Sequence, residues 1–179
     1  MFLNAYHNKI FDQLFFYITW LGDFVTPLSL FLILLFFRYR YALLMLYGNL
    51  LAAGITQMLK HTLFSNAERP KLFFEGSDQL KFVEGVENWL YNSFPSGHTT
   101  SAFATFFCLA LISNNALNKF LFFIIALSVG YSRIYLSQHF FDDIYAGSLV
   151  GVGSIMIVFY RMKRSNKPWL DNALFKNRN

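Results

Sequence analysis

The chain has 179 residues, of which 55% are hydrophobic, 20% aromatic and only 14% charged. This composition excludes an ordinary soluble domain, and the single cysteine, Cys108, excludes both a disulfide framework and a cysteine-rich metal site. The net charge of +5 does not indicate nucleic-acid binding, because the basic residues follow a pattern that membrane topology explains.

The N-terminal segment, residues 1–23, is predicted to be an amphipathic helix that lies in the membrane interface. Apolar residues recur at helical spacing between positions 10 and 21, while Asn8 and Asp12 leave another side polar. The segment lacks the basic start, unbroken apolar core and small-residue cleavage site of a signal peptide. We therefore expect it to be kept in the mature protein.

Five apolar stretches follow, and each is expected to cross the membrane as a helix. They are approximately residues 24–37, 41–63, 99–113, 120–136 and 144–160. The first and third are shorter than the roughly 20 residues that a bilayer core requires, so their assignment depends on the other three. The sequence predicts one all-α membrane domain, residues 1–179, with five transmembrane helices plus the interfacial helix. Six spans are the alternative.

The polar breaks between these stretches differ in charge, which predicts the orientation. Three breaks on one side hold most of the basic residues but only one of the ten acids, Asp171. These basic residues are Arg38, Arg40, Lys119, Arg161, Lys163, Arg164, Lys167, Lys176 and Arg178. The positive-inside rule places that side, with the tail 161–179, in the cytoplasm. The loop 64–96 then faces the periplasm or the extracellular medium.

The pattern of the outer loop 64–96 allows two structures. Apolar residues between positions 82 and 90 have helical spacing, whereas segments 71–74 and 80–83 could pair as a hairpin around Gly76. We favour a short interfacial helix in the second half of the loop.

Polar and ionisable residues gather at the outer ends of the predicted spans, which places them at one membrane level. They are Lys60, Arg69, Ser96, Gly97, His98, Arg133, His139 and Asp143. Ionisable groups at membrane depth are costly and usually functional. Phosphate fits this set, because guanidinium groups bind its oxygens in pairs and backbone N–H groups at the start of a helix approach an anion closely.

His139 and Asp143 are four residues apart, which is one helical turn, so the carboxylate can hold one ring nitrogen of His139 protonated. The other ring nitrogen then has a free lone pair, as nucleophilic attack on phosphorus requires. His98 would act from the other side as the general acid that protonates the leaving alkoxide. The spacing of His, Asp and Glu residues predicts no metal site.

Two motifs resemble the signatures of the type 2 phosphatidic acid phosphatase (PAP2) family, over about residues 57–151. The first is Phe94-Pro95-Ser96-Gly97-His98, and the second is Ser132-Arg133, five residues, His139, three residues, Asp143. The resemblance implies a helical bundle and a metal-independent phosphatase without a cofactor, which forms a phosphohistidine. It also implies roles: His139 as nucleophile, Asp143 as its partner, His98 as acid, and Ser96, Gly97, Arg69 and Arg133 as phosphate ligands.

One motif of the family is altered in this chain. The family's usual lysine precedes Arg-Pro with six residues between them, whereas eight residues separate Lys60 from Arg69 here. Either the loop bulges and Lys60 still binds the phosphate, or His61 or Lys71 takes its place.

These observations predict an integral enzyme of the bacterial inner membrane that hydrolyses a phosphomonoester or diphosphate of a membrane lipid on the periplasmic or extracellular side. Its expected partners are the bilayer and that lipid: polyprenyl diphosphate, phosphatidylglycerol phosphate, phosphatidic acid or lipid A. One alternative is a lipid phosphotransferase on the same scaffold. Two others are a vanadium haloperoxidase-like oxidoreductase, although those enzymes are soluble, and a non-catalytic transporter or scaffold, against which the intact motifs argue.

Overall fold

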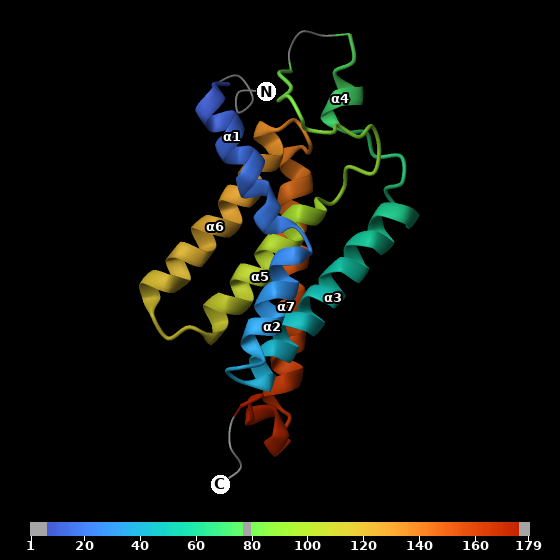
Figure 1. The fold of residues 1–179 in the computed structure, drawn as a ribbon. Helices are drawn as coiled ribbons and strands as arrows, with labels where there is room; N and C mark the ends of the chain where they lie inside the picture. The colour runs from blue at the N-terminus through green and yellow to red at the C-terminus, as the bar shows by residue number, and fades with distance from the viewer. Residues whose placement is uncertain (1–6, 77–79, 176–179) are drawn as a thin grey trace.

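The computed structural model describes residues 7–76 and 80–175, and in this part of the chain it is helical without any strand. Three helices are long and apolar enough to cross a membrane: α3 (Tyr39–Thr62), α6 (Ala116–Tyr135) and α7 (Phe141–Lys163). They form a bundle with the shorter apolar helix α5 (Gly97–Ile112), and the N- and C-terminal ends of the chain lie at opposite ends of this bundle (Figure 1). The predicted all-α membrane bundle is confirmed at this level.

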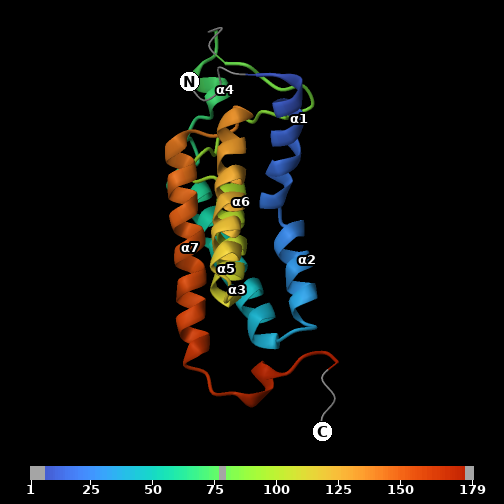
Figure 2. The same ribbon diagram turned by 90° about the vertical axis from the view of Figure 1, so that its left-hand side faces the viewer.

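The N-terminal segment forms α1 (Lys9–Ile18), a 3-10 turn η2 (Thr19–Gly22) and α2 (Val25–Leu34). With ten residues, α2 is about 15 Å long, which is half the thickness of a bilayer core. Taken together, Lys9–Gly22 and Val25–Leu34 are long and apolar enough for a fourth span that bends by 54°. Figure 2 shows α1 and α2 one above the other along one side of the bundle.

The number of spans therefore stays a prediction, because α5 is shorter than a typical membrane-spanning helix and the N-terminal pair is bent. The interfacial role expected for residues 1–23 also stays a prediction, and residues 1–6 lie outside the described part of the chain. In the described part, the polar side of α1 contacts α6. The Tyr135 hydroxyl donates a hydrogen bond of 2.6 Å to Asp12, and the His7 ring stacks on that of Tyr135.

Helix α5 packs closely against α7, and two glycines of α7 make this possible. A Cβ at Gly147 would lie 2.8 Å from the Ser96 carbonyl oxygen, and one at Gly151 would lie 2.5 Å from the Thr100 carbonyl oxygen. Glycines four residues apart form a flat strip that another helix can approach, as in membrane helix pairs generally. This contact brings the first turn of α5 beside the first turn of α7, where the two sequence motifs meet.

Small and apolar residues fill the interior around α3, α5 and α7. Cys108 is fully buried among them, as expected for a packing residue. The fully buried residues of this cluster are Ala42, Met45, Ala52, Ala104, Cys108 and Ile155, with relative exposures of 0–1%. Many large apolar side chains instead face outward from the helices, as in a protein whose solvent is lipid.

The outer loop differs from its prediction. Its short helix, α4 (Pro70–Phe73), lies in the first half, whereas the described residues 80–96 are neither helical nor a hairpin, so the helix expected in the second half is wrong. Main-chain carbonyls of Lys81 and Glu87 accept hydrogen bonds from Ser137 and Gln138. These two hydrogen bonds hold the irregular backbone of the loop against this end of the bundle.

The end of the bundle opposite the two motifs is fixed by an arginine. Arg40, near the start of α3, donates hydrogen bonds to Asp171 (3.1 Å) and to the Met162 carbonyl (2.6 Å). These bonds join α3, the end of α7 and the short 3-10 turn η3 (Pro168–Asp171). The basic side of the bundle is therefore at the end opposite the two motifs, while residues 176–179 of the tail lie outside the described part of the chain.

Candidate active site

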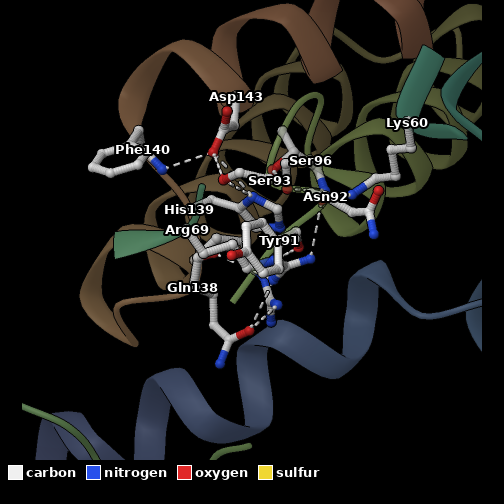
Figure 3. A network of polar contacts seen from close by, with 12 residues as sticks. Lys60, Arg69, Tyr91, Asn92, Ser93, Ser96, Gln138, His139, Phe140 and Asp143 are labelled. Atoms are coloured by element: carbon white, nitrogen blue, oxygen red, sulfur yellow. Dashed lines mark hydrogen bonds and ion pairs between the residues drawn. The ribbon is translucent and has the colours of Figure 1, made fainter. Parts of the chain in front are cut away.

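The residues predicted from the sequence come from five different elements and meet at the outer end of the bundle. Lys60 lies in the last turn of α3, Arg69 caps α4, Ser96 caps α5, Arg133 lies in the last turn of α6, and Asp143 lies in the first turn of α7. Figure 3 shows the polar network that connects most of them. Segments distant in sequence therefore form one polar site.

His139 and Asp143 form a buried pair. The Nδ1 atom of His139 is 3.2 Å from Oδ2 of Asp143, and the two side chains are 2% and 5% exposed. The same oxygen accepts hydrogen bonds from the Ser93 hydroxyl (2.5 Å) and the Phe140 N–H (2.9 Å). An oxygen surrounded by three donors is the environment of an ionised carboxylate, so we assign the ring proton of His139 to Nδ1.

The protonation state of His139 follows from its surroundings. Burial holds the pKa of His139 well below its ordinary value of 6.5, and the positive charges of Arg69 and Arg133 act in the same direction. The free imidazole is therefore neutral at physiological pH. With its proton on Nδ1, the lone pair is on Nε2.

Arg133 and Arg69 share an acceptor. Oε1 of Gln138 accepts from Nη2 of Arg133 at 3.1 Å and from Nη1 of Arg69 at 3.3 Å. Burial lowers the pKa of Arg69 from its ordinary 12.5, against the effect of Asp143, but a guanidinium in a protein keeps its charge. Within the described residues, Nε of Arg133 is buried without a hydrogen-bond partner. An anion that reached this site would find an unused donor.

Lys60 belongs to this network despite its altered spacing. Its Nζ donates a hydrogen bond of 2.6 Å to the Asn92 carbonyl, to which Nη2 of Arg69 also donates at 3.4 Å. The side chain of Lys60 is buried, and the chain between Lys60 and Arg69 forms an exposed turn. The two extra residues are accommodated in that turn, so Lys60 and Arg69 still meet, whereas His61 is exposed to solvent.

Ser96 and Gly97 start α5 beside this network. Ser96 is fully buried and caps the helix by accepting from Oγ1 (3.0 Å) and N (3.4 Å) of Thr99, while its N–H donates to the Asp143 carbonyl. A Cβ at Gly97 would meet nothing within 4 Å, so space is open on that side of the half-buried backbone. An uncovered helix N-terminus among cations can accept an oxyanion.

His98 lies between the polar network and an apolar groove. The charges of Arg133, Arg69 and Lys60 all act on its ring, which places it near the cations. The groove, of about 420 Å³, runs between α2, α3 and α5. Residues that line it include Phe24, Leu28, Met45, Leu50, Gly97 and His98.

Sequence patterns did not identify four residues that support this site: Thr19, Ser93, Gln138 and the carbonyl of Asn92. Ser93 and Gln138 are polar residues that are 1% and 3% exposed. Gln138 is the last of the five residues between Arg133 and His139, and Ser93 directly precedes Phe94, so their positions in or beside a motif were the available signal. Thr19 and Asn92 gave no such signal, because they belong to segments without a motif.

No group of three or more His, Cys, Asp or Glu side chains could hold a metal ion among the residues that the structure describes. The metal independence that the family resemblance implies stays a prediction.

The sequence profile of the PAP2 superfamily matches residues 41–167. A lipid A 4'-phosphatase of Porphyromonas gingivalis is 32% identical to this chain, and the alignment covers 94% of this chain and 73% of that protein. The bacitracin transport permease protein BcrC of Bacillus licheniformis is 37% identical over 75 residues, which are 42% of this chain and 36% of that protein. The chain thus matches only about a third of that permease's length.

Two solved structures share the fold. The crystal structure of Aquifex aeolicus LpxE has a TM-score of 0.78 and 24% identity, over 89% of this chain and 91% of that one. A PAP2-type phosphatidylglycerolphosphate phosphatase from Bacillus subtilis has a TM-score of 0.64 and 22% identity, over 92% and 83%. The profile match and the 32% identical relative confirm the family suggested by the two motifs. The chain belongs to the PAP2 superfamily and is a membrane lipid phosphatase of that type.

Proposed function

We propose that this protein is an outward-facing phosphatase that removes a phosphate group from a membrane lipid through a phosphohistidine intermediate. The observation that carries the proposal is the buried pair in which Asp143 accepts from Nδ1 of His139. Because Nδ1 is the donor, Nε2 of the neutral ring is the nucleophile.

In the first step, Nε2 of His139 attacks phosphorus and the bond from phosphorus to the ester oxygen breaks. His98 gives its proton to the departing alkoxide, and Asp143 stabilises the positive charge that the phosphorylated ring acquires. In the second step, His98 takes a proton from water, the resulting hydroxide attacks phosphorus, and the P–N bond breaks. Inorganic phosphate leaves and both histidines are restored, so each cycle consumes one lipid phosphate and one water.

Three cations and a helix start support this chemistry by binding the phosphoryl oxygens. Arg69 and Arg133 supply guanidinium donors, Lys60 supplies a third positive charge, and Ser96 and Gly97 supply the N-terminus of α5. The unpartnered Nε of Arg133 is consistent with this role, since a buried donor without an acceptor is rare unless a ligand supplies one. Lys60 and Arg69 would exchange the Asn92 carbonyl for phosphate oxygens.

The apolar groove beside His98 supports a lipid substrate. Phe24, Leu28 and Leu50 in its lining are 71%, 46% and 60% exposed, so the groove opens toward the hydrocarbon of the bilayer. An acyl or prenyl chain there would leave its phosphate at His98. The basic inner end, held by Arg40, supports an active site on the periplasmic or extracellular side.

Among lipid phosphates, we propose a phosphate of lipid A as the preferred substrate. The relative aligned over 94% of this chain is named a lipid A 4'-phosphatase. Phosphatidylglycerol phosphate, phosphatidic acid and polyprenyl diphosphate are the competitors that a test must include.

The test is phosphate release in detergent from these four lipids, with a chelator present. We expect release by the native protein, fastest from lipid A, and none by His139→Ala. His61→Ala is the matched control, because this exposed histidine is also at the outer end of α3 and should behave as native. If native protein of intact fold releases phosphate from none of the lipids, hydrolysis is refuted. If the native protein releases phosphate only without the chelator, metal independence is refuted but hydrolysis is not.

A phosphotransferase is recognised in the same lipid assay, whereas a transporter or scaffold is recognised by complementation in cells. A phosphotransferase would consume its donor lipid and produce a new phosphorylated lipid in place of inorganic phosphate. If the protein is a transporter or scaffold, the His139→Ala variant would still restore function in a deletion strain. Either result would replace the hydrolase proposal.

A further inference from the structure

The turn η2 (Thr19–Gly22) lies against two different parts of the active site. A 3-10 helix has three residues per turn, so Thr19 and Gly22, three positions apart, are on the same side of it. Both residues are buried. One of them contacts the last turn of α6 and the other contacts the first turn of α5.

Thr19 is bound to Arg133. Its Oγ1 accepts a hydrogen bond of 2.6 Å from Nη1 of the guanidinium, whose Nη2 donates to Gln138 at 3.1 Å. Two acceptors on different nitrogens fix the plane of a guanidinium as well as its position. Within the described residues Nε remains without a partner, so the hydroxyl of Thr19 orients a cation that still has a donor to offer.

Gly22 lies against His98. A Cβ at Gly22 would be 2.6 Å from the His98 carbonyl oxygen and 3.0 Å from the His98 Cβ, with Cγ1 of Val129 at 2.8 Å. Real Cβ atoms do not approach backbone this closely, so any side chain here would displace the first turn of α5. The absence of a side chain at Gly22 therefore determines where the His98 ring lies.

We propose that η2 is a positioning element of the active site: Thr19 orients Arg133 toward the phosphoryl group, and Gly22 sets the position of His98. The proposal rests on the phosphatase function proposed above. Both residues precede residue 41, where the match to the family profile begins. The N-terminal segment would thus complete a site whose reacting groups all lie in the matched region.

The two contacts predict different kinetic effects, and a comparison of two substrates distinguishes them. Arg133 binds the phosphoryl group, which every substrate has, so Thr19→Val should lower kcat/KM about tenfold for all of them, the effect of one hydrogen bond to a charged group. Thr19→Ser keeps the hydroxyl and should restore the rate to within about threefold of native. A general weakening of the fold would not be repaired by serine, which packs less well than valine.

Gly22→Ala should act only where a proton is needed. For an alkyl lipid phosphate, displacement of His98 should lower kcat about 10- to 100-fold, because the alkoxide must be protonated as it leaves. For p-nitrophenyl phosphate, whose leaving group is a stable anion, the loss should be less than about threefold. Gly54→Ala is the matched control: a Cβ at this exposed helical glycine would meet nothing within 4 Å, so native rates are expected.

The native protein and the four variants are compared in detergent after their thermal unfolding has been shown to match. If native protein hydrolyses neither substrate, the phosphatase function fails and this inference fails with it. If the native protein is active, two results would overturn the positioning role alone. One is a kcat/KM of Thr19→Val equal to native, and the other is a kcat/KM of Thr19→Ser as low as that of Thr19→Val. If Gly22→Ala lowers kcat equally for both substrates, the role of Gly22 in positioning His98 is overturned. Should Gly22→Ala not fold, the threonine pair decides alone.

Discussion

Replacing Asp143 by asparagine tests the charge of the catalytic pair while keeping its shape. Ser93, Phe140 and His139 all approach one oxygen, Oδ2, and the amide oxygen of asparagine can occupy that position. The hydrogen bonds survive, but the negative charge 3.2 Å from Nδ1 of His139 is lost. At an effective dielectric constant of about 20, two unit charges at that distance attract by about 5 kcal/mol. Because His139 becomes positive only when phosphorylated, we expect kcat to fall about 10³- to 10⁴-fold.

The assay is phosphate release under saturating lipid, together with the affinity for inorganic phosphate as a competitive inhibitor. Losing a carboxylate beside the cations should leave phosphate binding unchanged or tighter, so kcat and affinity are expected to separate. Asp142→Asn is the matched control, because that neighbouring carboxylate is exposed. A folded Asp143→Asn protein within tenfold of native kcat would show that the carboxylate does not stabilise a charged ring.

Three further results are expected. Arg133→Lys should lower kcat/KM about 10- to 100-fold, because one ammonium cannot replace the fork that bonds Thr19 and Gln138, and activity near native would remove the phosphate-binding role. Lys60→Met should raise KM for lipid phosphate about tenfold with a smaller effect on kcat, and an unchanged KM would mean that its ammonium only holds the loop. Since the pKa of His139 lies well below 6.5, its ring should stay neutral as the pH falls through 6.5 and become protonated only at lower pH. The protonation is followed by histidine ¹⁵N NMR, in which the His139 signals are those missing from the His139→Ala spectrum. Protonation of His139 near pH 6.5 would contradict the prediction.

The long helices were predictable because their apolar runs exceed what a soluble core needs. The stretch 41–63 corresponds to α3 (Tyr39–Thr62), and 120–136 corresponds to α6 (Ala116–Tyr135). The N-terminal segment was less predictable, because hydropathy does not reveal which partner a polar side will meet. The carboxylate of Asp12, which would suit water equally well, accepts a hydrogen bond from a tyrosine of α6.

The reacting groups of the site were predictable because their fixed spacing in the sequence places them at the ends of helices, where they can act on one substrate. The four positions His98, Arg133, His139 and Asp143 all reach the outer end of the bundle, as expected, although their catalytic roles stay predictions. The supporting residues could not be found in the same way. Ser93 lies in an irregular loop, so no periodicity links it to the carboxylate that it contacts.

The second half of the outer loop shows the limit of pattern reading. Helical spacing of apolar residues near position 82 is a local signal, whereas the backbone there is held by side chains distant in sequence, including Gln138. Gly85 and Asn92 also have left-handed backbone conformations, with φ of 81° and 57°, which interrupt a right-handed helix. Tertiary hydrogen bonds therefore outweighed local propensity.

The glycine strip of α7 links the chemistry to the bilayer. Gly147 and Gly151 set how closely α5 approaches, and the two helices carry the proposed acid and the partner of the nucleophile on their first turns. The separation of these groups thus depends on the contact between α5 and α7, and α7 is a candidate membrane span. A bilayer thickness that changes the tilt of one helix against the other would change that separation without touching the active site. We therefore expect turnover to depend on lipid composition as well as on the identity of the substrate.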